Sequence, residues 1–175
     1  MEPKKSALST ALKYAVITAL ASFIFSIIIY VTHMYLNSWI QWLGLVILIV
    51  GLIFVVRERR DKDLNGYITF GEAFNVGFVF CMILAVFSVL MNLLMTQVIA
   101  PDMMPEIIKN AEQQMIDKGM SDDQIQLGMK YTKMFTTPLA QVIGGLLFTA
   151  FFGAIFSLIV AAIFKKNNPQ LQPPL

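Results

Sequence analysis

The segment Asp61–Glu72 reads DKDLNGYITFGE and carries the oxygen-bearing side chains that calcium prefers. It matches the EF-hand loop, which needs oxygens at positions 1, 3, 5, 7 and 9 and a bidentate Glu at position 12. Gly66 stands at position 6, where such a loop turns sharply. The sequence therefore offers a calcium site, and its ligands would be Asp61, Asp63, Asn65, Tyr67, Thr69 and Glu72.

The same segment also fits an ordinary entry into a helix. Asn65-Gly66 is a turn dipeptide, and Thr69 with Glu72 three residues later forms a capping box. The two aspartates would then belong to a solvated run of mixed charge, whose cations repel Ca²⁺. EF-hand helices splay at ~90–140°, whereas helices that cross a bilayer together run nearly antiparallel. Calcium is therefore an alternative interpretation, and no other cofactor is expected.

The sequence contains none of the common catalytic or nucleotide-binding motifs. It has one cysteine and contains neither an HExxH motif, a phosphate-binding loop nor a dinucleotide fingerprint. A net charge of +2 is too small to suggest a nucleic-acid partner. The chain of 175 residues is 57% hydrophobic and only 14% charged, against about 25% charged residues in an average soluble domain. We therefore expect a membrane protein that is not an enzyme.

Charged side chains are missing from stretches of 43, 29 and 31 residues, which lie at 14–56, 73–101 and 134–164. A helix needs ~20 apolar residues to cross the ~30 Å hydrocarbon layer, and Asn37-Ser38 divides the first stretch into two. We therefore predict an all-α integral membrane four-helix bundle, with spans at 14–35, 39–56, 73–99 and 138–164. Residues 1–166 would form one domain, followed by a disordered cytoplasmic tail at 167–175.

Basic residues predict the orientation of these spans, because they accumulate on the cytoplasmic side. Nine of them lie on one side of the spans: Lys4, Lys5, Lys13, Arg57, Arg59, Arg60, Lys62, Lys165 and Lys166. On the other side, the connector 100–137 has four lysines but six acidic residues. Both termini are therefore expected in the cytoplasm, and the connector 100–137 outside. Within that connector we expect two short helices, because Gly119 resembles a helix stop and Ser121 with Gln124 resembles a capping box.

Small residues recur at every fourth position in two of the predicted spans. Such spacing lets membrane helices approach closely. The fourth span carries Gly145, Thr149, Gly153, Ser157 and Ala161, and the third carries Ala73, Gly77, Cys81 and Ala85. These two spans are therefore expected to form the tightest pair. Asn92, deep in the third span, is expected to hydrogen-bond to another helix.

The segment Gly66–Phe74, GYITFGEAF, together with four spans and a long acidic outer connector, resembles domain-of-unknown-function family 4199. The resemblance extends over roughly 11–166. It implies a small four-span protein of the bacterial inner membrane, of a kind seen mainly in Bacteroidota, with no established activity. It also implies that the glycine and ITFGEAF portion is a helix-entry motif, which favours the capping interpretation over calcium binding.

Together these patterns predict a non-enzymatic membrane protein with a structural, assembly or accessory role. Its partners would be the lipid bilayer and, through the small-residue faces, other membrane proteins or further copies of itself. Two alternatives remain. One is a calcium-responsive regulator that uses the loop 61–72, and the other is a small transporter or channel in which Asn92 and Gln97 line a path.

Overall fold

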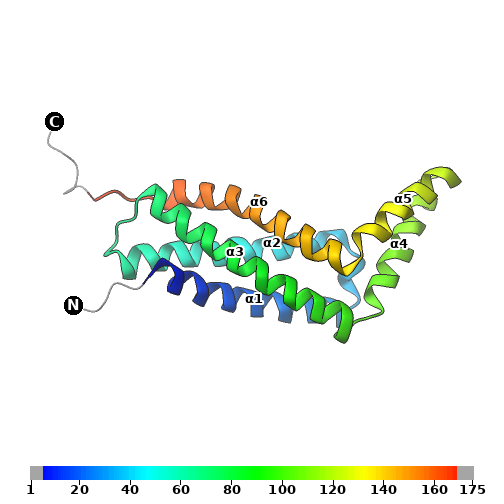
Figure 1. Cartoon of the computed structure of the whole chain (residues 1–175), viewed down its shortest axis with the longest axis horizontal. Helices are drawn as coiled ribbons and strands as arrows, with labels where there is room; N and C mark the ends of the chain where they lie inside the picture. The colour runs from blue at the N-terminus through cyan, green and yellow to red at the C-terminus, as the bar shows by residue number, and fades with distance from the viewer. Residues whose placement is uncertain (1–5, 169–175) are drawn as a thin grey trace.

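The computed structural model describes residues 6–168, and this part of the chain is helical (Figure 1). The predicted all-α class is therefore confirmed. Four helices are long: α1 (Ala7–Val31), α2 (Ser38–Glu58), α3 (Phe70–Leu94) and α6 (Pro138–Phe164). Two are shorter, α4 (Met103–Asp117) and α5 (Asp122–Phe135). The remaining turns are the 3₁₀ helix η1 (Met34–Leu36) and two π-helical segments, η2 (Arg59–Asp63) and η3 (Met95–Ile99).

Within residues 6–168, three helices are long and apolar enough to cross a membrane. They are α1, α6 and the continuous helix Phe70–Ile99 formed by α3 and η3. The fourth long helix, α2, has 21 residues, which at 1.5 Å per residue is about the thickness of the hydrocarbon layer.

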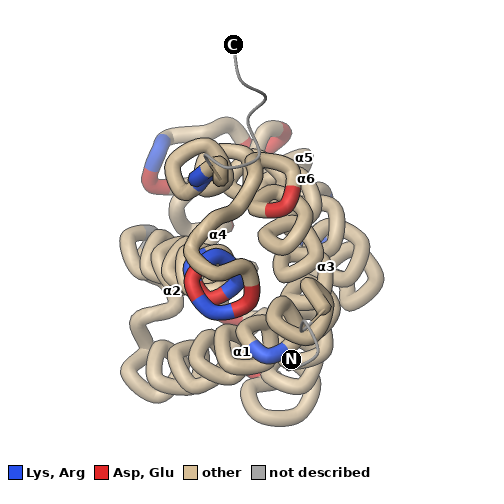
Figure 2. Tube along the Cα trace, turned by 90° about the vertical axis from the view of Figure 1, so that its left-hand side faces the viewer, with Lys and Arg blue, Asp and Glu red and all other residues tan. Residues whose placement is uncertain are grey.

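The four long helices pack side by side into an elongated body, which we call the helical body (Figures 1 and 2). Helix α3 makes the most extensive contacts, first with α6 and then with α1. One end of the body carries both ends of the described chain and the charged residues of the four long helices (Figure 2). We call this the charged end. The opposite end carries α4 and α5 and is the arm end (Figure 1).

The buried core lies mainly toward the charged end. Its largest fully buried side chains include Phe80, Leu52, Val55 and Ile68, and α1 contributes only small residues, such as Ala11. Toward the arm end the four long helices have few buried side chains. The helical body is therefore tightly packed at one end and looser at the other.

The helix boundaries follow the prediction closely except in α1. This helix begins at Ala7 and not near Tyr14, because the Ser6 hydroxyl accepts a hydrogen bond from the backbone N–H of Ser9 at 3.2 Å and caps the first turn. It ends at Val31 and not near Tyr35. His33 has a φ of 54°, a left-handed conformation that a helix cannot continue.

Helices α4 and α5 form an antiparallel hairpin that projects from the body at the arm end (Figure 1). The turn between them contains Gly119 at a φ of 69°, and Gln124 Oε1 accepts a hydrogen bond from Ser121 N at 3.0 Å. Two tyrosine hydroxyls fasten the hairpin to the body. Tyr30 donates to Asp102 Oδ1 at 2.8 Å, and Tyr35 donates to Glu106 Oε2.

Beyond α6 the chain runs back along the segment that precedes α3. Ile68 N donates to Lys166 O at 2.9 Å, and Lys166 N donates to Ile68 O at 2.8 Å. These two bonds form an isolated antiparallel bridge. Most of the predicted disordered tail, residues 169–175, lies outside the described part of the chain.

Candidate functional site

The calcium-loop segment forms a compact turn followed by the start of α3. Asn65 and Gly66 have positive φ values of 53° and 87°, and Gly66 N donates to Arg60 O at 2.8 Å. Thr69 Oγ1 accepts from Glu72 N at 3.3 Å, while Glu72 Oε2 accepts from Thr69 N at 3.1 Å. This reciprocal pair is the capping box that the sequence predicts for Thr69 and Glu72, and that prediction is confirmed.

The acidic side chains of this segment bind different partners. Asp61 pairs with Arg60, at 2.6 Å between Oδ1 and Nε. Asp63 accepts from Thr10 of α1, and Glu72 caps α3. No group of three or more His, Cys, Asp or Glu side chains that could hold a metal occurs between residues 6 and 168. A calcium-bound loop would therefore have to exchange these contacts for metal coordination.

The other predicted calcium ligands lie beside the end of α6. Tyr67 lies under the ammonium group of Lys166, which is 5.4 Å from the centre of the ring. Thr69 and Asn65 are exposed, and together with Tyr67 and Glu72 they border a hollow of about 340 Å³ beside the end of α6.

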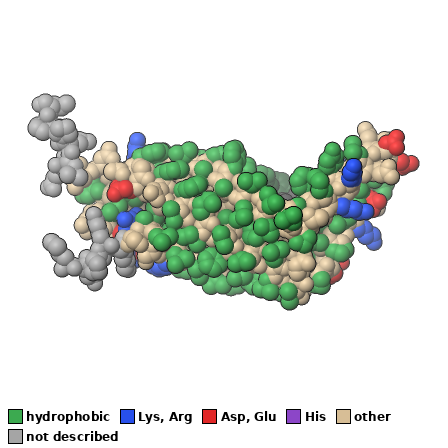
Figure 3. Space-filling view, viewed as in Figure 1, with side chains coloured by type: hydrophobic (Ala, Val, Ile, Leu, Met, Phe, Trp, Pro, Cys, Tyr) green, Lys and Arg blue, Asp and Glu red, His purple; other side chains and the backbone are tan. Residues whose placement is uncertain are grey.

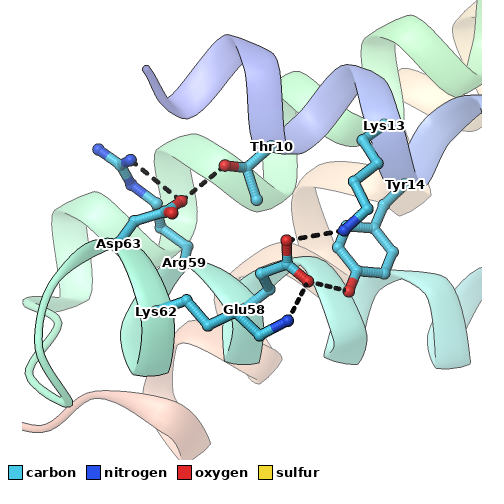
Figure 4. Close-up of polar contacts among 7 residues, drawn as sticks. All are labelled: Thr10, Lys13, Tyr14, Glu58, Arg59, Lys62 and Asp63. Carbon is cyan, nitrogen blue, oxygen red and sulfur yellow. Dashed lines mark hydrogen bonds and ion pairs between the residues drawn. The ribbon is translucent and has the colours of Figure 1, made fainter. Parts of the chain in front are cut away.

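Glu58, at the end of α2, is the centre of the most connected polar cluster (Figure 4). Its carboxylate accepts from Lys13 Nζ at 2.8 Å, from Tyr14 OH at 2.5 Å and from Lys62 Nζ at 3.3 Å. Its side chain is only 10% exposed. The hydrogen bond from Lys13, followed by that from Tyr14, lowers the pKa of Glu58 to about 2. The group is therefore ionised at any physiological pH and joins α1 to α2.

Asp63, in the π-helical turn η2, forms a second cluster beside the first (Figure 4). Asp63 Oδ2 accepts from Thr10 Oγ1 at 2.6 Å and from Arg59 Nη1 at 3.3 Å. The π-helical turn places Asp63 on the side that faces α1. Because Thr10 and Lys13 occupy the first two turns of α1, the two clusters fasten this end of the helix to α2 and η2.

The end of α6 joins the same region through aromatic contacts. The guanidinium carbons of Arg57 and Arg60 lie 5.9 and 5.7 Å from the centre of the Phe164 ring, a distance that suits cation–π attraction. With the bridge between Ile68 and Lys166, all four long helices are tied together at the charged end. The sequence did not predict this assembly, because Asp61, Asp63 and the charged residues around them resemble a solvated run of mixed charge.

The small residues of α3 and α6 meet along one line of contact. A Cβ atom added at Gly153 would lie 2.7 Å from Cys81 Cβ, and one added at Gly77 would lie 3.1 Å from Ser157 Oγ. Cys81 and Ser157 are fully buried, and their sulfur and oxygen atoms are 3.9 Å apart. The helices therefore approach so closely here that glycine is needed at position 153.

The other members of the two small-residue series follow the same line. Ala73, Ala85 and Ala161 are buried, and Thr149 is half-buried. Gly145 lies near the arm end, where an added Cβ would stand 3.3 Å from Val89 Cγ2. The contact is thus closest at Gly153 and relaxes toward the arm end.

Polar side chains lie between α1, α3 and α6 in the looser half of the body. Asn92 Nδ2 donates to Gln141 Oε1 at 2.9 Å, and Gln141 Nε2 donates to Thr136 O at 2.8 Å. Asn92 also borders a hollow of about 100 Å³ between α1 and α3, whose other polar lining residues are Ser22, Ser26 and Ser88. These three hydroxyls form no hydrogen bond with other residues of the described chain.

Comparison with known proteins gives a family but no activity. None of the curated proteins and none of the solved structures matches this chain. One family model matches residues 13–166, from the lysine that binds Glu58 to the lysine that pairs with Ile68. The match therefore covers the arm and all of the helical body except the first six residues of α1. The chain belongs to the family described as protein of unknown function DUF4199.

Proposed function

We propose that the protein is a four-span protein of a bacterial cytoplasmic membrane, with both termini in the cytoplasm and the hairpin of α4 and α5 outside. The length of α2 and its place beside the three apolar helices support the fourth span. Lys13, the cations of 57–62 and Lys165-Lys166 all lie at the charged end, in keeping with the accumulation of basic residues on the cytoplasmic side.

This topology is tested by fusing reporters to the full chain. Alkaline phosphatase inserted at Gly119 is expected to be active, because it folds only outside the cytoplasm. Green fluorescent protein fused after the last residue is expected to fluoresce, because it folds inside. A silent phosphatase at Gly119 with a dark C-terminal fusion would contradict the topology.

We further propose a non-enzymatic structural, assembly or accessory role. The observation that carries this proposal is the use of polar groups at the charged end. Glu58 and Asp63 bind a lysine, a tyrosine hydroxyl and a threonine hydroxyl of α1, the neighbouring helix. Groups held in this way fix helix positions, whereas ion and proton pathways use ionisable groups that face a cavity.

The role is tested with the purified full-length protein in liposomes and by cross-linking in native membranes. Liposomes containing the protein are expected to show no more ion or solute flux than empty ones, and cross-linking is expected to capture one membrane protein, or a second copy, at a fixed ratio. Saturable flux or substrate turnover would overturn the proposal.

A small transporter or channel is the second candidate, favoured by the polar hollow between α1 and α3. The four polar residues that line this hollow, and the hydrogen bonds from Asn92 to Gln141 and from Gln141 to Thr136, form a polar strip along the looser, arm-end half of the apolar body. The flux measurement above separates the two candidates.

A further inference from the structure

Helix α5 presents three distinct faces along its length. One face packs on α4, where Met129 is buried and a Cβ added at Gly128 would lie 2.8 Å from Met115 Sδ. A second face carries Lys130 and Lys133. The third face is apolar and has no partner in the described chain; it consists of Leu127, Tyr131, Met134 and Phe135, each between 52% and 67% exposed. We call this the apolar arm face.

The apolar arm face continues directly into the exposed side of α6. Only Thr136 and Thr137 separate α5 from α6, and the first exposed apolar residues beyond them are Leu139, Ile143 and Leu147. Helix α6 is apolar enough to span a membrane, so its exposed apolar side would contact lipid. The arm therefore extends a lipid-contacting surface beyond the end of the span.

The direction of the arm and the distribution of its charges agree with contact to the same bilayer. The arm leaves the helical body at an angle, and hydrophobic side chains line the edge that faces back toward the body (Figures 1 and 3). Lysine and acidic side chains gather on its other side and at its tip (Figure 3). An amphipathic helix with this arrangement lies in the interface, with its apolar face at the boundary between headgroups and acyl chains.

We propose that the arm is an interfacial anchor that docks on the outer leaflet of the bilayer crossed by the helical body. Leu127, Tyr131 and Met134 insert below the headgroups, while Lys130 and Lys133 stay at the level of phosphates and water. Tyr30 and Tyr35, which bind Asp102 and Glu106, hold the hairpin at the required angle. The inference rests on the proposed membrane-spanning topology.

The test places a bimane label at single cysteines in the full-length protein, in a Cys81→Ala background. The protein is reconstituted into vesicles of phosphatidylethanolamine and phosphatidylglycerol that contain lipids with a nitroxide near the headgroup. Leu127→Cys reports on the apolar arm face, and its sequence neighbour Gln126→Cys, on the polar side, is the matched control. Leu147→Cys, on the exposed side of α6, reports on membrane insertion of the body.

We expect the label at position 127 to be quenched at least about twofold more strongly than that at position 126, because an interfacial helix buries only its apolar face, by ~5–10 Å. In a second set of vesicles, whose lipids carry the nitroxide near the ends of the acyl chains, the label at 147 is expected to be quenched. Equal, weak quenching at 127 and 126 with strong quenching at 147 would overturn the anchor and leave the topology intact. Cross-linking of Leu127→Cys into a dimer that shields the label from lipid would assign the apolar arm face to a second copy and also overturn the anchor. Absence of quenching at 147 would instead contradict the membrane-spanning topology.

Discussion

Replacing Gly153 by alanine tests whether α3 and α6 are held at the separation that the structure gives. The added Cβ would lie 2.7 Å from Cys81 Cβ, about 1 Å closer than the ~3.5–4.0 Å at which carbon atoms pack without repulsion. Both atoms are Cβ atoms, and the backbone alone determines where a Cβ atom lies. No rotamer change can therefore relieve the contact, and the helices must separate. Overpacking of this kind costs about 1–3 kcal/mol.

Helix propensity acts in the opposite direction and has to be separated from the clash. Alanine stabilises a helix by about 0.5–1 kcal/mol relative to glycine. Gly144→Ala is the matched control, because a Cβ there meets nothing within 4 Å. The propensity gain is shared by both variants, so the difference between their free energies of unfolding isolates the clash. We expect Gly153→Ala to be less stable than Gly144→Ala by about 1–3 kcal/mol.

The assay is unfolding of the purified protein in mixed micelles by increasing dodecyl sulfate, followed by circular dichroism. A second substitution at position 81 identifies the source of the effect. Cys81→Gly removes the contacting Cβ and should restore stability to Gly153→Ala, whereas Cys81→Ala keeps that atom and should not. Equal stability of Gly153→Ala and Gly144→Ala, or equal rescue by both substitutions, would refute the close approach of α3 and α6.

Three further outcomes follow from the polar groups. Glu58→Gln should lower the free energy of unfolding at neutral pH by about 1.5–3 kcal/mol, the range for hydrogen bonds to charged groups. Because folding depresses the pKa of Glu58 from 4.5 to about 2, the wild type should lose this stability as the pH falls through that interval, and acid titration of Glu58→Gln should lack the loss. Terbium luminescence should show no saturable binding below about millimolar, the weak end of EF-hand affinities, in either wild type or Asp61→Ala; saturable binding that Asp61→Ala abolishes would restore the calcium interpretation. In a background without the native cysteine, Ser22→Cys should react with a charged methanethiosulfonate faster than Ile24→Cys. Position 22 borders a polar hollow that admits water, whereas position 24 lies on the exposed apolar side of α1. Equal reaction rates at the two positions would contradict a hydrated hollow.

Sequence patterns were sufficient to predict features that depend on one helix at a time. Long charge-free stretches located the apolar helices, and the bounds of α6 agree with the predicted span at both ends. The four-residue spacing placed Gly153 and Ser157 on one face of α6, which is the face that meets α3. Caps were equally local, since Thr69 and Glu72 lie within one turn of each other.

Features that depend on the relative position of two helices were not predictable in this way. Glu58 meets Lys13 and Tyr14 only because α1 and α2 are antiparallel with a particular offset along their axes. No local pattern specifies that offset, so the charges around Glu58 looked like a solvated run. The same limit applies to the calcium template. The spacing of residues in the template describes a loop in isolation. In the folded chain, Asp63 accepts a hydrogen bond from Thr10 of α1, which lies far away in the sequence.

The bridge between Ile68 and Lys166 constrains the order in which the contacts at the charged end form during synthesis. Lys166 follows the last residues of α6, so the bridge can form only after the ribosome has made that helix. The contacts of Glu58 and Asp63 with α1 involve residues made much earlier. The charged end is therefore built in two stages: α1, α2 and η2 can join while synthesis continues, and the arrival of α6 closes the structure around Ile68.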